Sequence, residues 1–258
     1  MTRYWSWGCL LVGGASVAGC HVISPEHLKS KPNEVAALPV SRAVDSPVEE
    51  EDSLGLAADA MVAGRDAEAA THLKRHLRNH PDQLVFRNQL AELLFKLDRH
   101  AEAQFHFARF DETAAASGLP LLGQRIHCHT RLMEIAQVRE DAFAEKLHRG
   151  IGLHLIAGEV QSKAEDPNEL SPEAEQLWCR AANELKEART LKEDDARSAW
   201  YLHLVWSRLD QPRPAEKALR AAAANAVFAP LPAGEDREMR NALNSADHRP
   251  SALVRNTR

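Results

Sequence analysis

The stretch LAELLFKLDRHAEAQFHF, residues 90–107, decides the fold class of this chain. Apolar residues recur at three- and four-residue spacings on both sides of a polar segment, Asp98 to His100. That periodicity is typical of amphipathic helices, and a polar interruption between two periodic segments is typical of a turn. The stretch therefore predicts two short helices joined as a hairpin.

The same residue roles occur 34 residues earlier in the chain. The matching sets are Leu56, Ala57, Ala60, Ala69 and Leu73 in the first unit and Leu90, Ala91, Leu94, Ala103 and Phe107 in the second. Each helix carries a small residue on its apolar face, and a small residue lets two paired helices approach closely. The turn of the first unit is predicted over residues 64–66, and Pro81 ends its second helix.

This period and these roles resemble the tetratricopeptide repeat (TPR), in which a first helix bears Leu and a small residue and a second bears Ala followed by a bulky apolar residue. The resemblance covers roughly residues 53–229. A third unit spans residues 196–229, with Trp200, Leu202, Trp206, Ala215 and Leu219 in the repeat roles. It departs from the pattern at His203, where a small residue is expected. The resemblance implies an all-α, TPR-like α-solenoid of antiparallel helical hairpins.

Two less regular segments lie between these units. Residues 125–160 predict a degenerate hairpin, and residues 173–191 predict a further amphipathic helix whose start is marked by Ser171 and Pro172.

Composition agrees with a helical, globular repeat domain. The apolar share of 44% is carried by Ala and Leu, aromatic residues make up 5%, and 27% of residues are charged, which favours helix over strand. The net charge of −5, with signs interspersed, argues against a nucleic-acid partner, which would need clustered basic residues.

The first twenty residues, MTRYWSWGCLLVGGASVAGC, have the layout of a cleaved secretory signal. Val17 to Cys20 resembles the lipobox of bacterial lipoproteins, which implies cleavage before Cys20 and acylation of that residue. An ordinary secretory cut after Ala18 and an uncleaved cytosolic start are the alternatives. Because the residue after Cys20 is His21 rather than Asp, the resemblance favours the outer membrane, facing the periplasm.

Four regions follow from these patterns: a lipoprotein signal peptide over 1–19, a lipidated Cys and disordered tether over 20–52, a helical repeat domain over 53–229 and a disordered tail over 230–258. The tether contains prolines and no sustained period, and the tail is polar and mixed in charge. Within the tail, residues 239–243 could form one weak turn.

Histidine and cysteine clusters raise a metal-binding alternative. His127, Cys128 and His129 form the densest cluster, but two residues at i, i+2 on a helix point about 200° apart. His148 or Cys179 would have to complete such a site, so we expect no metal and no other cofactor. His72, His76 and His80 are interpreted as a solvated helix face, and Cys128 and Cys179 as buried thiols rather than a disulfide.

Catalytic motifs are missing from the sequence. It contains no nucleophile elbow, no phosphate-binding glycine loop and no paired-cysteine motif, and Gly150 and Gly152 lie in a helical pattern without a preceding strand. We therefore expect a protein that is not an enzyme.

The TPR resemblance places ligand contacts on the first helix of each hairpin. The corresponding residues are Asn88, Glu92 and Phe95 in the second unit and Leu54, Ala58 and Met61 in the first. An apolar strip with polar groups beside it suits an extended peptide or a partner helix, although Leu54 and Met61 could equally pack against a neighbouring repeat. The predicted function is a membrane-anchored scaffold that binds another protein of the bacterial cell envelope; the alternative is a self-associating assembly factor, with the oligomeric state left open.

Overall fold

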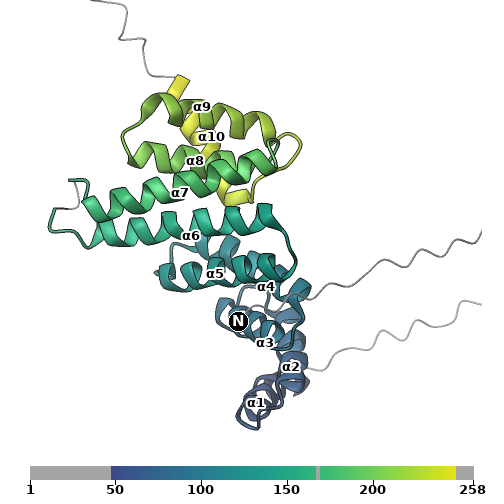
Figure 1. Cartoon of the computed structure of the whole chain (residues 1–258). Helices are drawn as coiled ribbons and strands as arrows, with labels where there is room; N and C mark the ends of the chain where they lie inside the picture. The colour runs from purple at the N-terminus through teal and green to yellow at the C-terminus, as the bar shows by residue number, and fades with distance from the viewer. Residues whose placement is uncertain (1–47, 167–168, 248–258) are drawn as a thin grey trace, which may run out of the picture. The chain divides into compact units, whose positions relative to one another are not determined.

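The computed structural model describes residues 48–166 and 169–247, and within these ranges every regular element is an α-helix. The helices are α1 (Val48–Val62), α2 (Asp66–Asn79), α3 (Leu84–Lys96), α4 (His100–Ser117), α5 (Leu122–Val138), α6 (Ala142–Ser162), α7 (Pro172–Leu191), α8 (Ala196–Arg208), α9 (Pro212–Asn225) and α10 (Ala233–Asp247) (Figure 1). The predicted all-α class is confirmed. The signal peptide, Cys20 and most of the predicted tether lie outside the described residues.

Four helix connections share one turn geometry. In each, one residue has a positive φ of 51° to 70°: Gly64, Asp98, Glu140 and Asp210. The N–H of the following residue donates to the carbonyl five positions earlier, in the pairs Arg65 to Ala60, Arg99 to Leu94, Asp141 to Ala136 and Gln211 to Trp206. This hydrogen bond closes a helix C-terminus in the Schellman arrangement. The pairs α1–α2, α3–α4, α5–α6 and α8–α9 are therefore hairpins of one kind.

The small residues of the repeat lie where the helices of a hairpin meet. Ala57, Ala91, Ala69 and Ala103 are 0–1% exposed, as the repeat pattern predicts. Leu56 is 36% exposed, so the expectation that it joins this apolar face is wrong. Its counterpart Leu90 is buried because α3 packs on both α2 and α4, whereas the extensive contacts of α1 within the described chain are with α2.

Helix α7 stands outside the set of hairpins with the shared turn. It packs lengthwise against α6, which is the other long helix (Figure 1). The close approach requires Gly150, since a Cβ atom there would lie 2.6 Å from Cγ of Leu185. As the sequence predicts, α7 begins at Pro172, and the Ser171 hydroxyl accepts a hydrogen bond from the N–H of Ala174.

The C-terminal segment corrects the predicted domain boundaries. Residues 233–247, assigned to a disordered tail, form α10, which packs on α9 and α4. Leu231, just before the helix, and Met239 within it are 7% and 3% exposed and belong to the core cluster of the last helices. At the other end, α1 begins at Val48, ahead of the predicted boundary at residue 53.

Successive helices pack one on the next, over two adjoining clusters of buried apolar residues. One cluster joins α1 to α5 and the other joins α6 to α10, with α5 contributing to both. The fold is a TPR-like α-solenoid. None of its described helices combines the length and the apolar composition needed to cross a membrane.

Candidate functional site

The predicted site residues of α3 meet a residue of α5. Glu92 and Phe95 lie on one face of α3 because residues three apart are neighbours on a helix surface. The Arg131 guanidinium of α5 lies 4.6 Å from the ring centroid of Phe95, and its Nη2 lies 3.2 Å from Oε2 of Glu92. The first helices of two consecutive hairpins thus share a surface that is partly open to solvent.

This surface carries further charges from α5. The His127 imidazole Nε2 lies 2.7 Å from Oε1 of Glu92, and Arg131 donates to Glu134 at 2.8 Å. Burial alone would lower the pKa of Arg131, but hydrogen bonds to Glu134 and Glu92 outweigh burial and raise it. The guanidinium is therefore a permanent cation between two carboxylates.

Asn88 lies one turn before Glu92 and is half-buried. Its side-chain oxygen is buried and accepts no hydrogen bond within the described chain. An unpaired buried acceptor costs about 1–3 kcal/mol.

The predicted residues of α1 contribute differently. Ala58 is exposed, and Met61 and Leu54 are half-buried. Leu54 packs against the core cluster of the first hairpins, as Phe95 does. The alternative interpretation, that Leu54 packs within the helical array, therefore explains the buried part of its side chain.

The sequence analysis missed Arg131, His127 and Glu134 as members of this surface. The third hairpin is degenerate, so its residues could not be aligned with the firm repeats. A usable signal was present in the i, i+4 spacing of His127 and Arg131, which places two basic groups on one face of α5.

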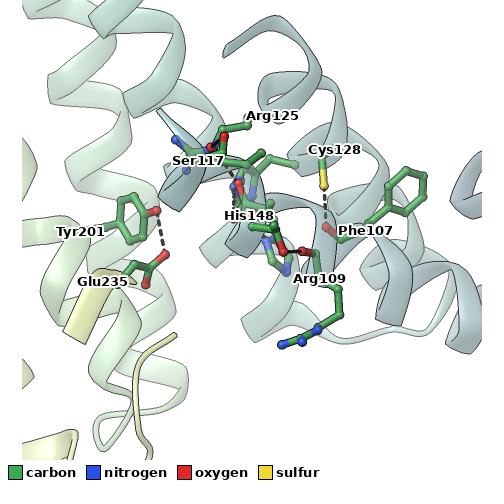
Figure 2. Close-up of polar contacts among 12 residues, drawn as sticks. Phe107, Arg109, Ser117, Arg125, Cys128, His148, Tyr201 and Glu235 are labelled. Atoms are coloured by element: carbon green, nitrogen blue, oxygen red, sulfur yellow. Dashed lines mark hydrogen bonds and ion pairs between the residues drawn. The ribbon is translucent and has the colours of Figure 1, made fainter. Parts of the chain in front are cut away.

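The side chains of the candidate metal cluster, His127, Cys128 and His129, lie in different environments. His127 is directed to Glu92, whereas His129 is buried, with its Nδ1 3.2 Å from Nδ1 of His148. Within the described residues, no three His, Cys, Asp or Glu side chains gather in a way that could hold a metal ion. Cys128 is buried and donates to the Phe107 carbonyl at 3.1 Å (Figure 2).

Two smaller expectations are wrong. Cys179 is exposed rather than buried, because it lies on the outer face of α7. His76 is 4% exposed rather than part of a solvated face. Its ring packs 4.6 Å from that of His80, and its Nε2 lies 2.8 Å from the side-chain oxygen of Gln83.

A buried charged cluster connects helices that are distant in sequence. Arg125 of α5 and Arg197 of α8 each donate to the Asp111 carboxylate of α4 at 2.9 Å. Arg197 also donates to Glu235 of α10 at 2.8 Å. The Tyr201 hydroxyl donates to the same carboxylate at 3.0 Å, as Figure 2 shows. Sequence patterns could not reveal it, since Asp111 and Arg197 are 86 residues apart.

The charges of this cluster shift the pKa values of its members. Burial would raise the pKa of Asp111, but His129, Arg197 and Arg125 outweigh burial and hold the pKa well below its usual value. Burial, with the nearby His129 and Arg197, holds the pKa of His148 well below 6.5. The carboxylate is thus charged and His148 is neutral at pH 7.

Comparisons with known proteins determine neither the family nor the function of this chain. No family model matches the chain, and no curated protein matches it. A solved structure described as the crystal structure of MamA protein is similar over 69% of this chain and 91% of that one. It shares 10% sequence identity and has a TM-score of 0.36. The TPR-like arrangement is therefore argued from the hairpins of this chain itself.

Proposed function

We propose that this protein is a non-enzymatic scaffold whose α3–α5 surface binds a segment of another protein. The observation that carries the proposal is the partly exposed set of Glu92, Phe95 and Arg131, which joins the first helices of two consecutive hairpins. An aromatic ring beside fixed charges can hold an extended or helical peptide by apolar and polar contacts together.

The place of action that we propose is the bacterial cell envelope. The support is the resemblance of residues 17–20 to a lipobox, which implies a lipid anchor at Cys20 and, with His21 after it, the outer membrane. Stable anchoring needs two or more lipid signals, and an N-terminal lipoprotein Cys carries several acyl chains. The helical domain would then face the periplasm and meet its partner there.

Crosslinking in cells followed by a pull-down through a C-terminal tag tests the binding surface. The comparison is between the wild type and a variant that carries Asn88→Ala and Phe95→Ala. Phe105→Ala on α4 is the control, since this ring is 58% exposed and lies on a second helix. Because Phe95 borders the core, thermal melting of both variants must show that they are folded.

Loss of one crosslinked protein in the double variant, with retention in the control, would support the surface and identify the partner. Retention of every partner in the double variant would exclude the α3–α5 surface. For the anchor, Cys20→Ala should move the protein from the membrane fraction to the soluble fraction, and unchanged fractionation would contradict lipidation.

Self-association is the second candidate function. It is favoured by the apolar residues left exposed on α1, where Leu56 is 36% and Val62 is 91% exposed, because the end of a solenoid needs a polar cap to remain soluble. Light scattering over a range of concentrations tests it, and a monomer at all concentrations would exclude it.

A further inference from the structure

The contact of α4 with α8 and α10 brings together parts of the chain that the regular stacking of neighbours does not join. In the chain, α5, α6 and α7 separate α4 from α8. Nη2 of Arg197 nevertheless lies 2.9 Å from Oδ2 of Asp111. Helix α10 also packs on α4, where Gly234 lies close to Ala116. We call Asp111, Arg197 and Glu235 the carboxylate bridge.

Asp111 and Glu235 are 2% and 7% exposed, so the carboxylate bridge is a buried set of charges. Removing one partner from a buried pair leaves an uncompensated charge and is strongly destabilising. Arg197 balances one carboxylate from each side of the contact. The bridge therefore holds α4 against α8 and α10 only while these charges stay matched.

The histidine pair, His129 and His148, adjoins this bridge. Nε2 of His129 lies 3.3 Å from Asp111 Oδ2, and the Nδ1 atoms of the two histidines are 3.2 Å apart. One Nδ1 must donate a hydrogen and the other must accept it, since two N–H groups would repel each other. A proton taken up by the acceptor nitrogen therefore removes this contact.

Charged and titratable groups face the histidine pair from several elements. Asp111 from α4, His154 from α6 and Arg197 from α8 interact with the pair itself. Arg125 from α5, Tyr201 from α8 and Glu235 from α10 surround it through their contacts with Asp111 and Arg197. Helix α7 presents the apolar Leu185 to α6 at Gly150. The two arginines already match the two carboxylates, and a proton on His148 adds a positive charge that Arg197 and His129 oppose.

We propose that the histidine pair and the carboxylate bridge form an acid-sensitive latch, which holds α8 and α10 on α4 at neutral pH and opens when the pair takes up a proton. The inference does not depend on which protein binds the α3–α5 surface. Water must reach an added charge, and separation of α4 from α8 and α10 opens the bridge beside the pair while it leaves the hairpins α3–α4, α5–α6 and α8–α9 intact.

The direction of the pH effect follows from His148. Burial keeps its pKa in the closed state below the ordinary 6.5, so an opened or unfolded state takes up the proton first. The closed state then loses stability as the pH falls below about 6.5, and it regains that stability when the pH rises.

Hydrogen exchange of the full chain, measured by mass spectrometry and corrected for the intrinsic pH dependence of exchange, tests the latch. Between about pH 7 and about pH 5, we expect protection of α10 to fall about tenfold or more in the wild type. Protection of the α1–α2 hairpin, which lies away from the bridge, should stay constant. His148→Asn should abolish the change in α10, because an amide can stand at the Nδ1 position without titrating.

His127→Asn is the matched control, since His127 lies on α5, its side chain is 46% exposed and it contacts a carboxylate. This variant should keep the wild-type response. Protection of α10 that is independent of pH, or that falls equally in His148→Asn, would overturn the latch. If His148→Asn does not fold, the wild type alone decides: a fall confined to α4, α8 and α10 supports the latch, and a fall shared by α1–α2 overturns it.

Discussion

At the scale of single residues, the hairpins depend on alanines that allow two helices to touch. Ala91 and Ala103 are completely buried at equivalent positions of the first and second helix of one hairpin. A methyl group fills the space between helices at these sites, and a larger side chain would force the helices apart.

Ala103→Leu should therefore destabilise the protein by about 1–3 kcal/mol through overpacking. Urea denaturation followed by circular dichroism measures the change, and Ala91→Leu should behave alike. Ala101→Leu is the control on the same helix, because Ala101 is exposed and the change there should stay within about 0.5 kcal/mol. Equal stability of Ala103→Leu and Ala101→Leu would contradict the close packing.

At the scale of elements, the turns explain why the hairpins recur with different residues. The left-handed conformation is held by Gly64 in the first hairpin and by Asp98, Glu140 and Asp210 in the others. This conformation costs free energy for residues with a Cβ atom, whereas it does not for glycine. The shared hydrogen bond, rather than a shared residue, therefore defines the turn.

Gly64→Ala should lower the free energy of unfolding by about 1 kcal/mol. The cause is conformational, because a Cβ atom at Gly64 would meet nothing within 4 Å and its φ is +70°. Gly55 also has open space and lies inside α1, so Gly55→Ala should raise stability by up to about 1 kcal/mol. Thermal melts should shift in opposite directions, and shifts of the same sign would show that the turn conformation is not the cause.

The contact between α6 and α7 depends on one glycine. Gly150→Ala would place a methyl group against Leu185, and we expect a loss of about 1–3 kcal/mol in unfolding free energy. Gly158→Ala is the control on the same helix, where a Cβ atom meets nothing within 4 Å. Chemical denaturation of both variants tests this, and a neutral Gly150→Ala would mean that α7 can shift without cost.

At the scale of the whole molecule, the buried bridge joins α4 to the last helices of the chain. Arg197 is matched by carboxylates on α4 and α10, so its loss leaves the buried Glu235 without an arginine partner and Asp111 with Arg125 in place of two arginines. The removal of Glu235 alone leaves Arg197 with Asp111. The two changes should therefore differ in size.

Arg197→Met should lower the free energy of unfolding by about 3–5 kcal/mol, and Glu235→Gln by less, since Gln can still accept hydrogen bonds. Denaturation at pH 7 measures both. Arg220→Met removes a surface pair in which the arginine side chain is 72% exposed, and its effect should be within about 1 kcal/mol. An Arg197 variant as mild as the Arg220 variant would show that the bridge does not stabilise the fold.

The sequence by itself predicted the helical hairpins, because their signals are local. Apolar spacing, small residues at helix contacts and the Ser171–Pro172 start all act within one or two turns of helix. The TPR resemblance that these signals support implied Asn88, Glu92 and Phe95 as ligand contacts on the first helix of a hairpin. It could not supply Arg131, because the hairpin that carries it departs from the repeat pattern.

Tertiary structure decided the features that depend on residues far apart in the chain. A polar segment such as residues 233–247 has too few apolar residues to predict a packed helix, and it is ordered here by contacts with Arg197, Tyr201 and α4. Asp111 and His148 look like ordinary polar residues in the sequence, and only the structure shows that both are buried beside the same arginine. Local periodicity therefore determines the hairpin helices, whereas long-range packing determines that α10 forms and which buried charges meet.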